Sequence, residues 1–220
     1  QAMTDTAVYP IPDHFSDAHV TPERYHTLYR QSLDDPDTFW SEQAQLLDWH
    51  SPWSAVSESD VAKGAARWFV DAKLNVSVNC IDRHLPERAH DTAIIWEGDD
   101  PDDSQSFTYQ ELKIQVCRFA NALRAQGIGK GDRVCIYMPM IPEAAFAMLA
   151  CARIGAIHSV VFGGFSPEAL KDRINDATCS MVITADEGAR GGKTVPLKRN
   201  VDAALAQVDC VDSVIVVRRT

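Results

Sequence analysis

The chain of 220 residues lacks a surplus of basic side chains. It carries 21 Lys and Arg against 31 Asp and Glu, which gives a formal net charge of −10. Proteins that bind nucleic acids or anionic membranes show the opposite balance, and no basic stripe is interleaved with aromatic residues for stacking on bases. We therefore expect no nucleic-acid partner, although a local basic pocket remains compatible with this total.

Long apolar runs are also lacking. The longest apolar-rich stretch covers residues 144–152 and is bounded by Glu143 and Arg153. It is much shorter than the roughly 18 residues that a membrane-spanning helix needs. The N-terminus shows neither the basic start nor the apolar segment of a secretory signal. These absences predict no membrane partner and a cytoplasmic location.

Motifs for metal binding and nucleophilic catalysis are missing as well. The six cysteines are scattered without a C-x-x-C pair, and most lie in apolar segments, where a free cysteine behaves as a small buried hydrophobe. The sequence contains no G-x-S-x-G elbow, no H-E-x-x-H, and no G-x-G-x-x-G after a predicted strand. We therefore predict a reduced chain with no metal site and no catalytic residue of its own.

Residues 1–75 differ from the rest of the chain because they hold four of the five tryptophans and the turn signals Asp35-Pro36 and Ser51-Pro52. Thr21-Pro22-Glu23 and Asp35-Pro36-Asp37 each combine a capping residue, a first-turn proline and an acid, which predicts helices ending near residues 32 and 47. We interpret residues 1–75 as a helical and irregular N-terminal extension around a larger body.

From residue 76 onward, the pattern alternates between strands and helices. The expected strands are 93–97, 133–138, 157–162, 180–184 and 211–217, and the expected helices begin near residues 109, 142, 167 and 197. Continuously apolar strands that alternate with helices indicate a mostly parallel, doubly wound α/β sheet with helices on both faces. Such a sheet binds ligands at the carboxyl ends of its strands. We expect residues 76–220 to be the first, incomplete part of such a domain.

The loop 186–194 is the strongest candidate for a binding site. Four basic residues and no acidic residue lie between Arg190 and Arg199. Glycine amides can approach an anion closely, and arginine and lysine are the usual phosphate partners. The alternative is a solvated, flexible loop. A P-loop is disfavoured because the position six residues before Lys193 is Glu187 rather than glycine.

Three other features are weaker candidates. Gly163-Gly164 lies between a predicted strand and a capped helix, and it either receives an anion or a flat base or simply forms a tight turn. The run Asp82-Arg83-His84 is typical of a local salt bridge rather than a catalytic triad. His158 lies in an apolar strand, which favours a buried core histidine.

Several long strings resemble the AMP-forming acetyl-CoA synthetase family, in the family's order and over nearly the whole chain. They are LNVS (74–77), NCIDRHL (79–85), YMPMIPEA (137–144), LACARIGA (149–156), VVFGGFS (160–166) and TADEG (184–188). The tryptophan-rich stretch before them is similar to the family's N-terminal extension. The resemblance implies a ligase that makes acetyl-CoA from acetate, ATP and CoA through acetyl-adenylate, with Mg²⁺ handling the triphosphate.

The resemblance also implies which residues of this chain receive the nucleotide end of CoA. They are Phe162, Gly163, Gly164, Arg190, Gly191, Gly192, Lys193 and Val195. In this view Arg190 and Lys193 neutralise the 3′-phosphate or the diphosphate, and Val195 lies beside the adenine. The family's ATP loop, acyl pocket, magnesium site and C-terminal domain are absent from these 220 residues, so we expect the chain alone to be inactive.

Two alternatives stay open at this point. The substrate acid could be propionate or another short-chain acid, because the acyl pocket lies outside this chain. The chain could also be a non-catalytic module that binds CoA or another nucleotide. A reading frame that continues past Thr220 into an ATP-binding loop would favour the ligase over the module.

Overall fold

The computed structural model describes residues 11–12, 15 and 17–220. The chain forms two compact units. One ends at Ala72 and leaves out residues 48–50, which belong with Lys73–Thr220 in the second. In the described part of the chain, none of the helices has the length and apolar character that crossing a bilayer requires.

The first unit contains two helices and a hairpin. Its elements are α1 (Pro22–Asp34), α2 (Pro36–Ala44), β1 (Ala55–Asp60), a 3₁₀ turn (Val61–Lys63) and β2 (Ala65–Val70). Both predicted helix starts are confirmed, because Thr21 and Asp35 accept hydrogen bonds from backbone amides of the first turns at 3.3 and 3.2 Å. α2 ends earlier than predicted, at Ala44.

The antiparallel hairpin β1–β2 corrects the description of residues 1–75 as helical and irregular. It was missed because its strands do not alternate between apolar and polar residues, and only Val56 and Val70 are buried in it. The turn is local: the Asp60 side chain accepts the amide hydrogen of Lys63, and Gly64 has a φ of +65°. A left-handed residue of this kind favours glycine.

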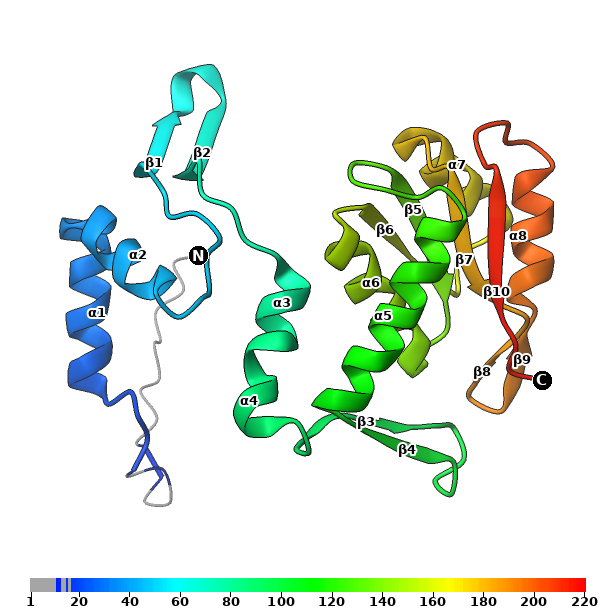
Figure 1. The fold of residues 1–220 in the computed structure, drawn as a ribbon, viewed down its shortest axis with the longest axis horizontal. Helices are drawn as coiled ribbons and strands as arrows, with labels where there is room; N and C mark the ends of the chain where they lie inside the picture. The colour runs from blue at the N-terminus through cyan, green and yellow to red at the C-terminus, as the bar shows by residue number, and fades with distance from the viewer. Residues whose placement is uncertain (1–10, 13–14, 16) are drawn as a thin grey trace, which may run out of the picture. The chain divides into compact units, whose positions relative to one another are not determined.

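The second unit is built around a four-stranded sheet in the order β10-β7-β5-β6, in which every pair of neighbours is parallel. The strands of this sheet are β5 (Arg133–Met138), β6 (Ile157–Phe162), β7 (Met181–Ala185) and β10 (Ser213–Val217). Its long helices are α5 (Tyr109–Ala125), α6 (Pro142–Ile154), α7 (Pro167–Ala177) and α8 (Leu197–Leu205). Smaller elements are α3 (Val76–Cys80), a 3₁₀ turn (Asp82–His84), α4 (Leu85–Arg88) and the hairpins β3 (Thr92–Glu97)–β4 (Ser104–Thr108) and β8 (Gly188–Arg190)–β9 (Lys193–Val195). The predicted α/β class is confirmed (Figure 1).

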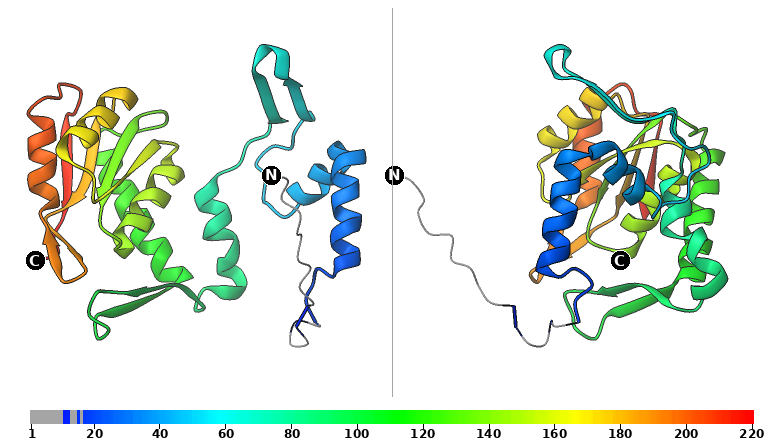
Figure 2. Two further views of the ribbon diagram at one scale, coloured as in Figure 1. Left: turned by 180° about the vertical axis from the view of Figure 1, so that it is seen from behind. Right: turned by 90° about the vertical axis from the view of Figure 1, so that its left-hand side faces the viewer.

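Helices cover both faces of this sheet, as predicted. Because successive side chains of a strand point to opposite faces, β5 sends Val134 and Ile136 into the core beneath α5 and α6 and sends Cys135 and Tyr137 into the core beneath α7 and α8. All four of these side chains are at most 1% exposed. The right-hand view in Figure 2 shows the sheet between α5 on one side and α7 and α8 on the other.

Local signals set the helix ends. Thr108 and Glu111 form a reciprocal capping box at the start of α5, and the Ser166 hydroxyl accepts an amide hydrogen at the start of α7. Gly155 ends α6 with a φ of +78°, a conformation that glycine adopts without strain.

Three weaker predictions need correction. His158 is exposed on the edge strand β6 rather than buried in the core. Asp82 does not pair locally, because its carboxylate lies 2.5 Å from Arg153 of α6 and 3.2 Å from Lys113 of α5. Of the six cysteines, only Cys135, Cys151 and Cys179 are buried, although all six are free thiols.

Candidate functional site

A cavity of about 640 Å³ opens at the carboxyl ends of the parallel strands. The chain leaves β5 for α6 and the edge strand β6, whereas β7 and β10 lie on the other side of β5. The loops that follow β5 and β7 therefore diverge, which creates the crevice expected at the switch point of a doubly wound sheet.

Segments from six parts of the second unit line this cavity. They are residues Trp96, Glu97, Gly98 and Asp99; Met138, Pro139, Met140 and Ile141; Val160, Val161, Phe162, Gly163 and Gly164; Gly188, Ala189 and Arg190; Val195 and Leu197; and Arg219. Five of the eight sequence-predicted site residues are among them: Phe162, Gly163, Gly164, Arg190 and Val195.

Arg190 and Phe162 form a stacked pair beside the cavity. The guanidinium carbon of Arg190 lies 4.9 Å from the centroid of the Phe162 ring, within range of a cation–π interaction. A Cβ atom on Gly164 would lie 2.6 Å from the Phe162 ring and 3.0 Å from Arg190 Nη1. Gly164 does not have a positive φ, so glycine is needed here for space rather than for backbone conformation.

The Gly163-Gly164 turn is held from the core by Tyr137. Its hydroxyl lies 3.0 Å from the carbonyl oxygen of Gly163 and 2.8 Å from that of Phe165, and it accepts a hydrogen bond of 3.2 Å from the Asn200 side chain. The Tyr137 side chain is fully buried. A polar anchor inside the core therefore fixes the position of the turn at the cavity wall.

Most of the basic loop 186–194 folds as the β8–β9 hairpin. Gly191 and Gly192, with φ of +57° and +73°, form its turn and do not line the cavity, and neither does the exposed Lys193. The amide of Gly192 donates to the carboxylate of Asp99 at 3.3 Å. The hairpin also differs from a P-loop, because its backbone amides form hydrogen bonds between the two strands.

Two further cavity residues, Trp96 and Arg219, belong to no motif that sequence analysis could recognise. The Arg219 guanidinium carbon lies 5.3 Å from the centroid of the Trp96 ring, and the indole N–H donates to the Met140 carbonyl at 2.7 Å. These contacts join the β3–β4 hairpin, the loop after β5 and the end of β10. Such separations along the chain leave no local pattern to recognise.

Asp186 connects the β8–β9 hairpin with the end of β10. Its carboxylate accepts the amide hydrogens of Arg219 at 2.8 Å, Thr220 at 3.1 Å and Glu187 at 2.8 Å. These hydrogen bonds, that of Arg219 above all, lower the pKa of Asp186 to about 2. The ionised carboxylate therefore holds the segments that carry Arg190 and Arg219 together.

Two family models match this chain. Residues 81–220 match the family described as AMP-binding enzyme, and residues 25–80 match the family described as acetyl-coenzyme A synthetase N-terminus. The chain belongs to the AMP-binding enzyme family. The match to this family begins at Ile81 and so includes every residue that lines the cavity.

Individual relatives extend the comparison. The chain is 69% identical over 203 residues to acetyl-coenzyme A synthetase 2 of Pseudomonas putida, covering 92% of the chain and 32% of the relative. It is 61% identical over 220 residues to acetyl-coenzyme A synthetase of Saccharophagus degradans, covering 99% of the chain and 34% of the relative. The chain thus spans about a third of the length of the curated relatives it matches.

A solved structure resembles the fold as well. Acetoacetyl-CoA synthetase from Streptomyces lividans superposes with a TM-score of 0.81 at 28% identity, covering 92% of this chain and 32% of that one. The parallel sheet and its helices therefore occur in that solved synthetase structure as well.

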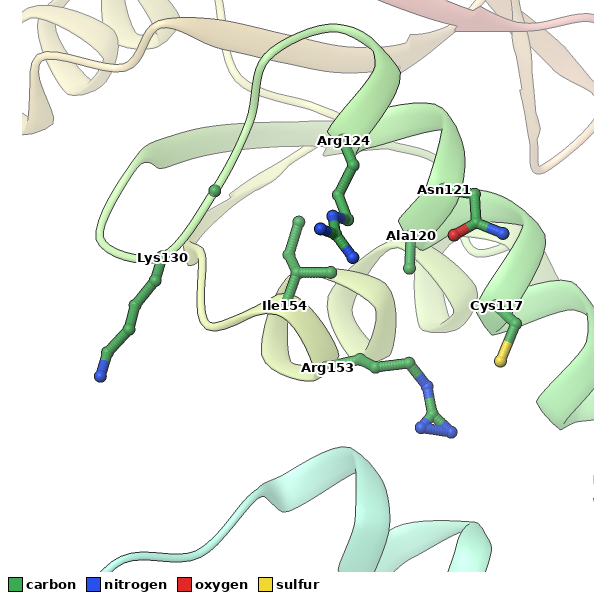
Figure 3. A pocket seen from close by; sticks show the side chains of 8 residues that line it. Cys117, Ala120, Asn121, Arg124, Lys130, Arg153 and Ile154 are labelled. Atoms are coloured by element: carbon green, nitrogen blue, oxygen red, sulfur yellow. The ribbon is translucent and has the colours of Figure 1, made fainter.

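A second pocket, of about 450 Å³, lies where α5 and α6 end (Figure 3). Arg124 and Arg153 lie in the last turns of these helices, where cations offset the negative end of the helix dipole. Arg153 is also bound by Asp82 at 2.5 and 2.9 Å. In Figure 3, the ammonium group of Lys130 points away from Arg124. The cations diverge, and we assign no ligand to this pocket.

Among the described residues, no group of three or more His, Cys, Asp or Glu side chains could hold a metal ion. The described residues therefore do not fit a Mg²⁺ site.

Proposed function

We propose that this chain is the N-terminal portion of an acetate–CoA ligase and that its cavity receives the nucleotide end of CoA. In the proposed reaction, the acetate carboxylate attacks the α-phosphorus of ATP and pyrophosphate leaves. The thiol of CoA then attacks the carbonyl carbon of acetyl-adenylate and AMP leaves, which yields acetyl-CoA. The part of this chain is to bind and orient CoA for the second step.

One observation carries the proposal: the Arg190–Phe162 stack over Gly164 borders the cavity at the switch point of the sheet. Phe162, Gly164 and Val195 provide apolar and flat surface for an adenine ring. Arg190 provides a planar fork of donors for a phosphate. Gly191, Gly192 and Lys193 remain proposed contacts at the tip of the hairpin, where a phosphate outside the cavity would meet them.

The names of the relatives support CoA as the shared ligand. The enzymes from Pseudomonas putida and Saccharophagus degradans are named for acetyl-CoA, and the solved structure from Streptomyces lividans is named for acetoacetyl-CoA. CoA is common to both names, whereas the acid differs. A propionate–CoA or other short-chain ligase is therefore the second candidate, because none of the residues assigned here contacts the acid.

We also propose which other molecules take part in the reaction and where in the cell it takes place. ATP and Mg²⁺ are proposed reactants of the longer protein and are given no site in this chain. We infer a cytoplasmic protein with small-molecule partners and without nucleic-acid or membrane partners, which is supported by the net charge of −10 and by the absence of a membrane-spanning helix among the described residues.

Calorimetric titration of the chain with CoA and dephospho-CoA tests the proposal. We expect CoA to bind, dephospho-CoA to bind more weakly, and Arg190→Ala to weaken CoA binding roughly tenfold through the lost charged contact. Arg199→Ala is the matched control, since Arg199 is exposed on α8 and does not line the cavity. Equal affinities for all variants would contradict the site.

Activity assays separate a ligase from a CoA-binding module. With acetate, ATP and CoA, we expect the 220-residue chain alone to produce no AMP. A longer protein that contains this chain should produce AMP and acetyl-CoA in equal amounts. CoA binding by that longer protein without AMP release would favour the non-catalytic module instead.

A further inference from the structure

We propose that Arg219 is a second phosphate-binding cation of the cavity and that it serves a different anionic group of CoA from the one bound by Arg190. This inference rests on the proposed function, because it names CoA as the ligand. It assigns a role to an arginine that neither a local motif nor the sequence resemblance indicates.

Arg219 and Arg190 reach the cavity from opposite edges of the sheet. Arg219 follows β10 at one edge, whereas Arg190 stacks on Phe162, which ends β6 at the other edge. Three spacings of about 4.8 Å separate these strands, so the strand ends lie roughly 14 Å apart. Both arginines nevertheless line the same cavity. Two cations that reach one cavity from opposite edges of the sheet suit a ligand with two anionic groups, and CoA has a 3′-phosphate and a 5′-diphosphate.

Both the backbone and the side chain of Arg219 are held by contacts within the second unit. Its amide is fixed by the Asp186 carboxylate at 2.8 Å, and its guanidinium stacks on Trp96 at 5.3 Å. The Trp96 indole is anchored in turn to the Met140 carbonyl at 2.7 Å. An arginine that is ordered before the ligand arrives loses less conformational freedom on binding.

The acidic groups near Arg219 leave part of its guanidinium available. The cavity lining contains two acids, Glu97 and Asp99, and Asp99 already accepts the Gly192 amide hydrogen at 3.3 Å. The ion pair of Arg219 with Asp103 is long, at 3.8 Å, and the Arg219 side chain is 26% exposed. A guanidinium has five N–H donors, so this pair leaves donors available for a phosphate.

The test measures the affinities of CoA and dephospho-CoA for the 220-residue chain, Arg219→Ala, Arg190→Ala and Arg218→Ala. Arg218 is the matched control because it is the adjacent arginine, is exposed and does not line the cavity. Thermal unfolding of each variant confirms that it is folded. Arg219→Lys keeps the charge without the planar fork and serves as a second variant.

We expect Arg219→Ala to weaken CoA binding roughly tenfold, Arg219→Lys to weaken it less, and Arg218→Ala to leave it unchanged. With dephospho-CoA, which lacks the 3′-phosphate, one of the two alanine substitutions should no longer lower the affinity, whereas the other should still lower it. This difference is expected because the two arginines bind different groups of CoA. If both effects persist or both vanish with dephospho-CoA, the assignment to separate groups is wrong.

The other outcomes separate this inference from the proposed function. If Arg190→Ala weakens CoA binding while Arg219→Ala binds CoA as tightly as Arg218→Ala does, the role of Arg219 is overturned. The proposed CoA site then stands. If the unmodified chain does not bind CoA, both proposals are overturned.

Discussion

The hydroxyl of Tyr137 lies 3.0 Å from the carbonyl oxygen of Gly163. This contact joins the interior of β5 to the glycine turn at the cavity wall. Tyr137 belongs to the core beneath α7 and α8, and its side chain is fully buried. The geometry of the candidate CoA site therefore depends on a polar group deep inside the fold, not only on the residues that line the cavity.

Replacing Tyr137 with phenylalanine tests this dependence. The change leaves two backbone carbonyls and the Asn200 amide without their partner, so we expect the free energy of unfolding to fall by about 1–3 kcal/mol. CoA affinity should also fall at temperatures where the variant remains folded, because the turn is no longer held. Tyr29→Phe, on the exposed face of α1, is the control for removal of a hydroxyl. Unchanged CoA affinity in folded Tyr137→Phe would contradict the positioning role.

Gly164→Ala tests the need for space beneath the Arg190–Phe162 stack. The added Cβ would lie 2.6 Å from the Phe162 ring, so the ring and the guanidinium must move. Because Phe162 is 53% exposed and can swing outward, we expect a loss of stability below about 1 kcal/mol. CoA affinity should fall several-fold. A variant with a displaced stack and full CoA affinity would show that the stack does not contribute to binding.

The pH dependence of Asp186 is a further prediction. Its pKa of about 2 lies below the value of about 3.9 for an unfolded chain. The folded state therefore favours the ionised form, and its contribution to stability is complete above about pH 4 and is lost as the pH falls towards 2. Carboxyl NMR titration should give a midpoint near 2, and Asp186→Asn should flatten the loss of stability between pH 4 and 2. A midpoint near 4 would contradict the hydrogen-bonding pattern.

The cysteines should divide by reactivity. Burial raises the pKa values of Cys135 and Cys151 to about 12, which leaves about 10⁻⁴ of each thiol ionised at pH 8. We expect a thiol-reactive disulfide reagent to modify the exposed Cys80 in the folded chain and to reach Cys135 and Cys151 only after unfolding. Mass spectrometry of labelled peptides measures this, and rapid native labelling of Cys135 would contradict the buried position of β5.

Local signals predicted much of the fold. The capping residues Thr108 and Ser166 and the terminal Gly155 fixed helix ends because their hydrogen bonds and backbone angles involve neighbouring residues. The parallel strands were predictable because burial on both faces makes them continuously apolar. His158 was misplaced because an edge strand can carry the same apolar residues as a central strand while one side faces solvent.

Long-range contacts were not predictable in this way. The interaction of Arg219 with Trp96 and the hydrogen bond between Tyr137 and Gly163 join residues that are distant in sequence, so no spacing rule reveals them. The basic, glycine-rich composition of residues 186–194 was visible, but a hairpin and an anion-binding loop use the same residues. Pairing between β8 and β9 shapes these residues as a hairpin and places Lys193 outside the cavity.

NMR mapping of CoA binding tests the central claim most directly. On titration of the isotope-labelled chain with CoA, we predict that the amide signals of Gly163, Gly164 and Ala189, and the Arg190 side-chain signals, shift in a saturable way. The amides of Asn121 and Gly129, in the second pocket, should not shift. Shifts confined to the second pocket, or no shifts at saturating CoA, would contradict the assignment of the cavity to CoA.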